Sequence, residues 1–294
     1  MSDNKKKWAG DTFGTPFMHK CLIAALRHTD VRVFYVFSAV FIVPWCLVFS
    51  AGSRIIYRYL RGVHGFSVWR SLWLTLVNYV LFSQVVIDKF ALFAGRRMRI
   101  SIEGYDNFLS LSARAGGFVM LSAHIGCYEM AGYELCSQDK PFNALVYAGE
   151  KEAVMKGRDK LFTENNIKMI PVRDDMSHLF GINSALQRGE IVSIPADRVF
   201  GSPKVVTVQL LGRSVQLPAG PFSVPAMRGD SVLAVNVMKT GVREYTAYVT
   251  PLDYDRKAPR RQQIQQIADG YARELGRMLK RYPAQWYNYF DFWK

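Results

Sequence analysis

Residues 117–129 read GFVMLSAHIGCYE, a stretch that predicts a buried strand ending at a histidine. The part from Gly117 to Ala123 is a nearly continuous apolar run, which is typical of a strand covered on both faces in a parallel sheet. His124 follows directly, and an apolar helix start comes after Gly126. Because α/β folds place their sites at the carboxyl edge of the sheet, we expect His124 to lie at a functional site.

An acidic residue, Glu129, follows His124 at a distance of five positions. With His124 in the loop and Glu129 in the first helical turn, the carboxylate can fold back onto the ring. It would then fix the tautomer and stabilise the imidazolium, while the free ring nitrogen removes a proton from an attacking hydroxyl or amine. Such a base contributes a factor of ~10²–10⁴ in rate. The spacing alone is equally compatible with a hydrogen-bonded structural histidine.

Strand-like and helix-like segments alternate on either side of this stretch. The other expected strands are 98–103, 142–147, 167–172, 191–195, 205–211 and 232–238, and the expected helices between them are 150–165 and 177–188. From Pro259 the pattern is helical with one apolar face, and Pro283 ends that helix. This alternation predicts an α/β sandwich, a mixed sheet flanked by helices.

An apolar helical segment precedes the α/β part. From Val33 to Ser53 the chain has 21 residues without a charge, bounded by Arg32 and Arg54. That length matches a hydrocarbon core of roughly 30 Å. Pro44 lies near the middle, and basic residues flank both ends, so no asymmetry sets an orientation. The segment is either a kinked span or two shorter helices in the interface, with a buried core helix as the remaining alternative.

A second uncharged run, 71–87, contains Asn78, Ser83 and Gln84 and is too polar to be assigned as a span. The neighbouring Trp69 and Trp73 are typical of the headgroup level of a membrane. We therefore divide the chain into three parts. They are 1–95, a basic tail with membrane-associated helices; 96–258, the α/β core; and 259–294, an amphipathic helix with an aromatic tail packed on the core.

The charge balance restricts the partners. The 294 residues include 38 Lys and Arg against 24 Asp and Glu, a net charge of +14, and half of the residues are hydrophobic. This apolar content excludes intrinsic disorder. A basic surplus beside apolar runs favours an anionic membrane surface or an acidic protein, and we expect no nucleic-acid partner. The four cysteines form no CxxC pair or framework, and no N-x-S/T sequon is present, so a reducing, cytosol-facing environment fits best. The start of the chain is not typical of a signal peptide.

Several other kinds of site are less favoured. The chain has no G-x-S-x-G elbow, P-loop or G-x-G-x-x-G, which argues against serine hydrolases and nucleotide binding. Cys127 lies close to His124, but we expect it to pack into the helix face rather than to act as a nucleophile. Asp174, Asp175 and His178 are better explained by a helix N-terminus than by a metal site, so we expect no metal.

The motif HIGCYE after the GFVMLSA strand resembles the H-x4-D/E signature of the late, lauroyl/myristoyl-type lipid A biosynthesis acyltransferases, membrane enzymes of Gram-negative bacteria. The resemblance covers roughly residues 30–294. Its further elements are Gly157-Arg158, Pro195-Ala196-Asp197-Arg198 with Gly201, Leu211-Gly212-Arg213, Pro218-Ala219-Gly220-Pro221, and the aromatic tail 285–293.

The resemblance implies a membrane-bound enzyme that moves a fatty acyl chain from an acyl-carrier thioester to a lipid hydroxyl. His124 would be the general base and Glu129 its support. Arg158, Asp197, Arg198 and Gly201 would bind substrate. The donor would be the thioester of acyl carrier protein or of coenzyme A, a co-substrate, with no other cofactor. We expect the catalytic domain on the cytoplasmic side of the inner membrane.

Two further expectations concern details of the site. We expect the backbone amides of Gly126 or Cys127, at the helix start, to stabilise the tetrahedral oxyanion. The chain also has Ile125 and Cys127 where the family often has an aromatic residue and an asparagine, and Arg198 and Val199 where it usually has an acidic neighbour. Lipids other than lipid A are therefore equally compatible acceptors. The alternatives to this enzyme are a non-catalytic basic protein that binds membrane surfaces or a carrier, and a thioesterase.

Overall fold

The computed structural model describes residues 15–135, 140–147, 166–172, 177–199, 204–290 and 292–293. The α-helices are α1 (Pro16–His28), α2 (Val31–Phe37), α3 (Val43–Phe49), α4 (Gly52–Gly62), α5 (Val68–Phe93), α6 (Tyr105–Ser112), α7 (Ala131–Glu134), α9 (Ser177–Gln187), α10 (Gly220–Arg228) and α11 (Arg260–Arg281). The strands are β1 (Arg99–Glu103), β2 (Phe118–Ser122), β3 (Phe142–Tyr147), β4 (Ile167–Val172), β5 (Ile191–Pro195), β6 (Val205–Leu210), β7 (Arg213–Pro218), β8 (Ser231–Gly241) and β9 (Glu244–Pro251). The helix expected at 150–165 lies outside the described residues.

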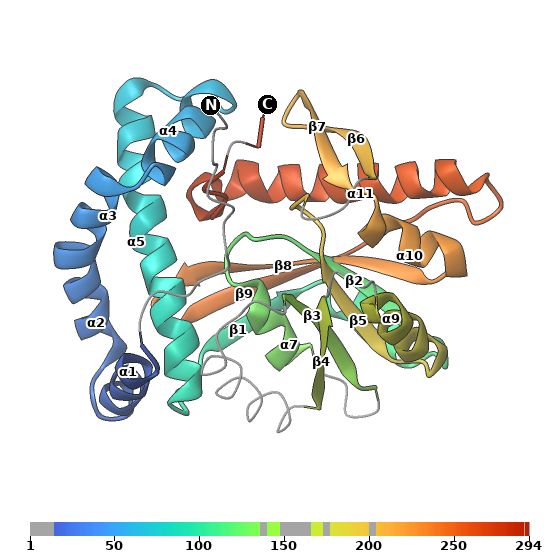
Figure 1. Ribbon diagram of the computed structural model, residues 1–294, viewed down its shortest axis with the longest axis horizontal. Coiled ribbons are helices and arrows are strands. Elements are labelled where there is room, and N and C mark those ends of the chain that lie inside the picture. The colour runs from blue at the N-terminus through green and yellow to red at the C-terminus, as the bar shows by residue number, and fades with distance from the viewer. Residues whose placement is uncertain are drawn as a thin grey trace, which may run out of the picture.

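Within the described parts of the chain, seven strands form one sheet in the order β1-β9-β8-β2-β5-β3-β4 (Figure 1). Only β8 and β9 run antiparallel, and the other neighbours are parallel. The predicted α/β fold with a mixed sheet flanked by helices is therefore confirmed. The strand that precedes His124, β2, lies at the centre of the sheet between β5 and β8.

The sequence prediction differs from the structure in three strands, one of which, β7, it omitted. Residues 205–210 are extended as expected, but they form a separate antiparallel hairpin with β7. The prediction also omitted β9, which pairs with β8 on one side and β1 on the other. All five residues from Tyr245 to Val249 are buried, so the strand has no polar face that would give an alternating pattern. Thr246 and Thr250 also interrupt the continuous apolar run that is typical of a buried strand.

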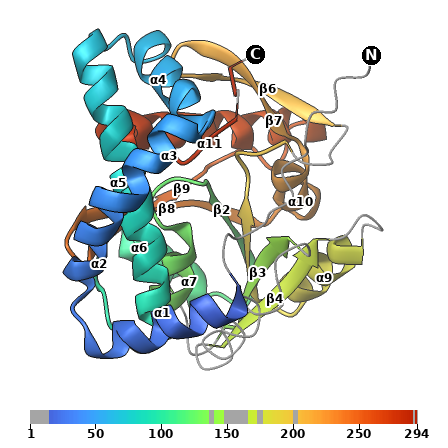
Figure 2. The same cartoon turned by 60° about the vertical axis from the view of Figure 1, so that its left-hand side comes forward.

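Alternate residues of the central strand contribute to two hydrophobic cores. Val119 and Leu121 pack on one side with residues of α4, α9, α10 and α11. Phe118 and Met120 pack on the other side with residues of α1, α5 and α6. The two views show α11 across one face of the sheet and the N-terminal helices α1 to α5 stacked along one end of it (Figures 1 and 2). The sheet is thus fixed from both faces, which positions its carboxyl edge.

The predicted apolar segment is a continuous run of α2, a π-helical turn at Ser38–Ile42, and α3. Pro44 does not split it. In the preceding π turn the Val43 amide donates to the Ser38 carbonyl, and this local geometry accommodates a proline, which has no N–H to donate. Only 22% of its apolar window is buried. Its exposed large side chains are Val33, Val36, Phe37, Val40, Phe41, Ile42, Trp45, Val48 and Phe49. The segment is therefore not a buried core helix, and its exposed apolar face is consistent with membrane association.

The second uncharged run belongs to α5, a helix also long and apolar enough to cross a membrane. Two of its polar residues contact other parts of the protein, and one of them, Ser83, lies 3.1 Å from the Ser38 hydroxyl. The Asn78 side-chain amide donates to the carbonyls of Ala284 and Trp286 at 2.9 and 3.0 Å. Trp69 and Trp73, at the start of the same helix, are exposed. Asn78, one of the polar residues that lowered the hydropathy of this run, thus attaches the C-terminal tail.

A buried ion pair joins α5 to the sheet. Asp88 accepts from the Lys239 ammonium of β8 at 2.6 Å and from the Tyr245 hydroxyl of β9 at 2.5 Å. Tyr35 of α2 donates to the same carboxylate. The N-terminal helices are therefore connected to the sheet by charge and hydrogen bonds as well as by apolar contact. The proposed division of the chain into three parts remains a prediction.

Candidate active site

Two side chains meet at the carboxyl edge of the sheet. His124 follows β2 and Asp197 follows β5, and the two strands are parallel neighbours with Ser122 opposite Pro195. Because their ends lie side by side, the residues just beyond them are brought together. The Asp197 carboxylate accepts a hydrogen bond from the His124 backbone N–H at 3.0 Å and lies 2.7 Å from Nδ1 of the ring. The prediction that His124 lies at this edge is confirmed.

The electrostatics of this pair favour an ionised carboxylate. Burial of Asp197 by itself raises its pKa, but the charge of His124, the hydrogen bonds from His124 and the charge of Arg198 outweigh burial and lower the pKa below its usual value. An ionised Asp197 makes Nδ1 the protonated ring nitrogen and leaves Nε2 as the basic one. The His124 side chain is 20% exposed, and no described residue donates to or accepts from Nε2. This is the geometry that a general base requires.

Glu129 lies in the short 3₁₀ turn Tyr128–Met130 after His124. Its carboxylate forms an ion pair with the Lys89 ammonium of α5 at 2.8 Å. The carboxylate on Nδ1 of His124 belongs to Asp197 and not to Glu129, which corrects the expected pairing. The sequence signal that indicates Asp197 is its position directly after a second buried strand, the same signal that selected His124. A supporting role of Glu129 remains a prediction.

Gly126 has a structural reason to be glycine. Its φ is +53°, and a Cβ would lie 2.0 Å from the Val237 carbonyl oxygen. Its amide donates to the Gln285 carbonyl at 2.9 Å, and the Cys127 amide donates to Val237 at 2.7 Å. Both amides are thus occupied by backbone carbonyls, so the structure does not support them as oxyanion donors.

The C-terminal tail holds the His124 loop from the other side, which the sequence did not indicate. Trp286 pairs with Ile125 in an isolated antiparallel bridge, and the Tyr287 amide donates to the His124 carbonyl at 3.2 Å. The Gln285 side chain accepts from the Lys239 amide at 2.9 Å and donates to the Lys239 carbonyl at 2.7 Å. The loop is thus fixed between β8 and the tail.

The remaining predicted residues contribute unequally. Arg198 donates to the Tyr287 carbonyl at 3.3 Å, so it connects the Asp197 turn to the tail. Arg158 and Gly201 lie outside the described residues, and the substrate roles of these two residues remain predictions. Asp174 and Asp175 also lie outside the described residues.

Burial raises the pKa of the Cys127 thiol to about 12, which argues against a nucleophilic cysteine. Among the residues with described positions, no group of three His, Cys, Asp or Glu side chains could hold a metal ion.

Comparison with known proteins identifies the family. The sequence profile of the bacterial lipid A biosynthesis acyltransferases matches residues 87–294, a range that includes His124, Asp197 and the tail. A solved structure, the 1-acyl-sn-glycerophosphate (LPA) acyltransferase PlsC from Thermotoga maritima, is 14% identical with a TM-score of 0.41, covering 92% of this chain and 100% of that one. A search of curated proteins found no match. With more than half of its length matched by the profile, this chain is an acyltransferase that belongs to the bacterial lipid A biosynthesis acyltransferase family.

Proposed function

We propose that this acyltransferase moves a fatty acyl chain from an acyl-carrier thioester to a hydroxyl of a lipid acceptor, with Nε2 of His124 as the general base. The observation that supports this proposal is the His124–Asp197 pair, in which a buried carboxylate holds Nδ1 and leaves Nε2 accessible. Because the chain belongs to an acyltransferase family, we no longer favour the alternative of a non-catalytic membrane-surface protein.

The proposed reaction begins when His124 takes the proton of the acceptor hydroxyl. The oxygen then attacks the thioester carbonyl carbon and forms a tetrahedral intermediate. The intermediate collapses as the C–S bond breaks, and the leaving sulfur takes the proton from the imidazolium. The products are a lipid ester and a free carrier thiol. Asp197 stabilises the imidazolium between the two proton transfers, a task for which its buried, ionised carboxylate is suited.

Glu129 and the arginines have secondary places in the proposal. Lys89 fixes the Glu129 carboxylate one turn beyond His124, where its negative charge would add to that of Asp197. We assign Arg158 and Arg198 to the phosphate or thioester of the substrates, because arginine is suited to binding phosphate in a bidentate way. The net charge of +14 supports an acidic carrier protein as the donor and anionic lipids around the enzyme.

We place the enzyme on the cytoplasmic side of the inner membrane. Two apolar helical segments, Val31–Phe49 and Val68–Phe93, support membrane association. Either a kinked span or an interfacial position agrees with the exposed apolar face of the first. Lipid A and other hydroxyl-bearing bacterial lipids are both compatible acceptors.

The experiment that tests this function incubates the purified full-length protein with a long-chain acyl-carrier thioester, with and without a bacterial lipid extract. Mass spectrometry follows the acylated lipids, and a thiol reagent follows the released carrier. Acceptor-dependent thiol release with a new lipid ester supports the proposal. Release of the same size without acceptor indicates a thioesterase and contradicts it.

A matched pair of histidine variants tests the residue assignment. His124→Ala should lower transfer by about 10²–10⁴. His28→Ala, which alters an exposed histidine in the last turn of α1, should leave transfer unchanged. Near-normal transfer by the folded His124→Ala protein would refute the mechanism.

A further inference from the structure

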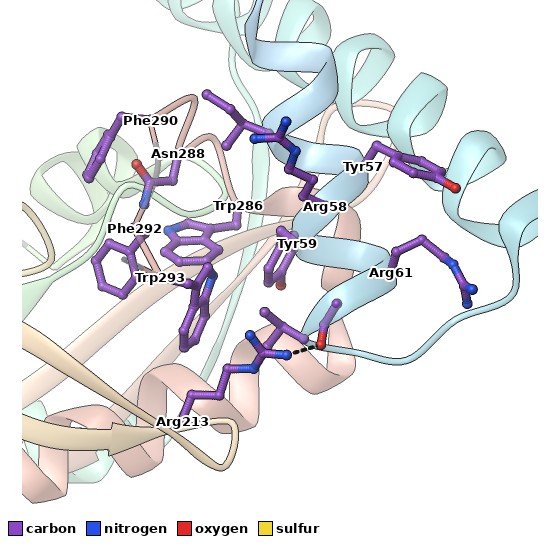
Figure 3. A pocket seen from close by; sticks show the side chains of 13 residues that line it. Tyr57, Arg58, Tyr59, Arg61, Arg213, Trp286, Asn288, Phe290, Phe292 and Trp293 are labelled. Carbon is purple, nitrogen blue, oxygen red and sulfur yellow. Dashed lines mark hydrogen bonds between the residues drawn. The ribbon is translucent and has the colours of Figure 1, made fainter.

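A pocket of about 370 Å³ lies between α4, the C-terminal tail and the turn of the β6–β7 hairpin (Figure 3). Tail residues supply much of its aromatic wall, including Trp286, Phe292 and Trp293. Neither His124 nor Asp197 is among the described residues that line it. The pocket therefore has other lining residues than the His124–Asp197 pair, although Trp286 of its wall pairs with Ile125 beside His124. Its volume lies in the range of about 300–1,000 Å³ that small-molecule sites occupy.

The charged part of the pocket is basic. Arg58, Arg61 and Arg213 line it, and no acidic residue does so among the described residues. The Arg213 guanidinium donates to the Gly62 carbonyl, which fixes the β6–β7 turn against the end of α4. Figure 3 shows the Arg58 guanidinium on the side of the tail, whereas Arg61 points away from it. Within the described parts of the chain, Arg58 has no carboxylate partner.

A buried amide adds a neutral polar group to the wall. Asn288 is only 3% exposed, and neither its Oδ1 nor its Nδ2 has a hydrogen-bond partner among the described residues. The Nε1 donor of Trp286, 1% exposed, is also unpartnered there. Leaving such buried groups unpaired is unfavourable. A ligand that offers both an acceptor and a donor would recover this free energy.

The position of the pocket indicates where the ligand comes from. Helix α4 connects α3, which ends in the exposed Val48 and Phe49, to the start of α5, where Trp69 is 82% exposed. Figures 1 and 2 both show these segments together at one end of the molecule. Exposed tryptophans beside an apolar helix are typical of the headgroup level of a membrane, so the pocket lies next to the surface that we assign to the membrane.

We propose that this pocket binds the head group of an anionic membrane phospholipid. Arg58 contacts the phosphate, since arginine forks match phosphate oxygens, whereas Arg213 lies at the opposite end of the pocket and holds the β6–β7 turn against α4 (Figure 3). The Asn288 amide and the Trp286 indole meet hydroxyl or ester oxygens of the glycerol part, and Phe292 and Trp293 contact the first acyl carbons. This binding site is additional to the proposed acyl transfer, and its test does not require turnover.

The test measures binding of dioctanoyl-phosphatidylglycerol to the purified full-length protein by native mass spectrometry from a non-ionic detergent. Arg58→Gln should bind at least about tenfold more weakly than the wild type. The control Arg54→Gln removes the same charge from an exposed arginine of the same helix that does not line the pocket, and it should bind within about twofold of the wild type. Asn288→Ala tests the neutral contact without changing charge and should also weaken binding.

Three results would overturn the proposal. One is equal weakening in Arg58→Gln and Arg54→Gln, which would indicate non-specific attraction by the net positive charge. Another is binding of dioctanoyl-phosphatidylcholine as tight as that of phosphatidylglycerol. The third is complete displacement of the lipid by excess inorganic phosphate, which would indicate a free-anion site. Thermal unfolding of each variant confirms that it is folded, and unchanged binding by His124→Ala separates this test from that of acyl transfer.

Discussion

Asp197 accepts two hydrogen bonds from His124, one from the backbone N–H at 3.0 Å and one from ring Nδ1 at 2.7 Å. A single buried carboxylate therefore fixes both the main chain and the ring orientation of the proposed base. Asp197→Asn keeps the shape but removes the charge that stabilises the imidazolium. We expect kcat for acyl transfer to fall by about 10²–10⁴ with little change in KM. Asp253→Asn, an exposed carboxylate, is the control, and equal kcat values for the two variants would contradict the assignment.

Glu129 and Lys89 form an ion pair at 2.8 Å between the turn after His124 and α5. If Glu129 supports His124 by its charge, Glu129→Gln should lower kcat about tenfold or more, and Lys89→Met should lower it less, because the carboxylate remains. Steady-state kinetics of the two variants makes the comparison. Equal losses in both would show that the ion pair matters only for structure.

Gly126 has room only for a hydrogen atom beside the Val237 carbonyl oxygen. Gly126→Ala places a side chain in a left-handed conformation that costs about 1–2 kcal/mol, in addition to the clash. We expect a lower midpoint of thermal unfolding and loss of acyl transfer, because the His124 loop must move. Gly116→Ala is the matched control, since a Cβ at that position would meet no atom within 4 Å beyond its neighbours in the chain. A Gly126→Ala protein with wild-type stability and activity would refute this explanation.

Cys127 is buried, and burial followed by the charge of Glu129 raises its pKa from 9.0 to about 12. The thiol therefore stays protonated near pH 8, and iodoacetamide should label the exposed Cys21 much faster than Cys127. As pH rises from about 9 toward 12, the unfolded chain loses this proton while the folded protein keeps it, so the free energy of unfolding should decrease. Cys127→Ala should keep acyl transfer and reduce this alkaline loss. Peptide mass spectrometry after labelling and pH-dependent unfolding are the measurements, and rapid labelling of folded Cys127 would contradict the prediction.

Asp88 and Lys239 are an ion pair with almost no solvent exposure. Removing one partner leaves a buried charge without compensation, so Asp88→Asn and Lys239→Met should each lower the free energy of unfolding by about 3–5 kcal/mol. The double variant Asp88→Asn/Lys239→Met should lose less than the sum of the single losses. It should not recover fully, because Tyr35 and Tyr245 also donate to Asp88. Denaturant unfolding of all four proteins completes the cycle, and additive losses would show that the pair is not coupled.

The amino-acid sequence by itself determined the elements with a strong local pattern. The apolar run before His124 indicated a central strand, and the apolar face from Ile264 to Tyr282 indicated the helix α11. The uncharged segment Val33–Ser53 indicated a helix suited to a membrane. These predictions depend on the order of apolar residues along the chain, and burial of apolar surface is the main force that selects such segments.

Only the tertiary structure decided which groups meet. Asp197 is 73 residues from His124 along the chain, and the pair forms because β2 and β5 are parallel neighbours. Likewise, the Gln285 carbonyl accepts from the Gly126 amide because the tail passes over the end of β8. Position 126 requires glycine because a Cβ there would collide with the Val237 carbonyl oxygen. Sequence spacing favoured Glu129 as the partner of His124 because it can detect only local neighbours. The carboxylate on Nδ1 was chosen instead by the order of strands in the sheet, a property that residues far apart in the chain determine together through packing.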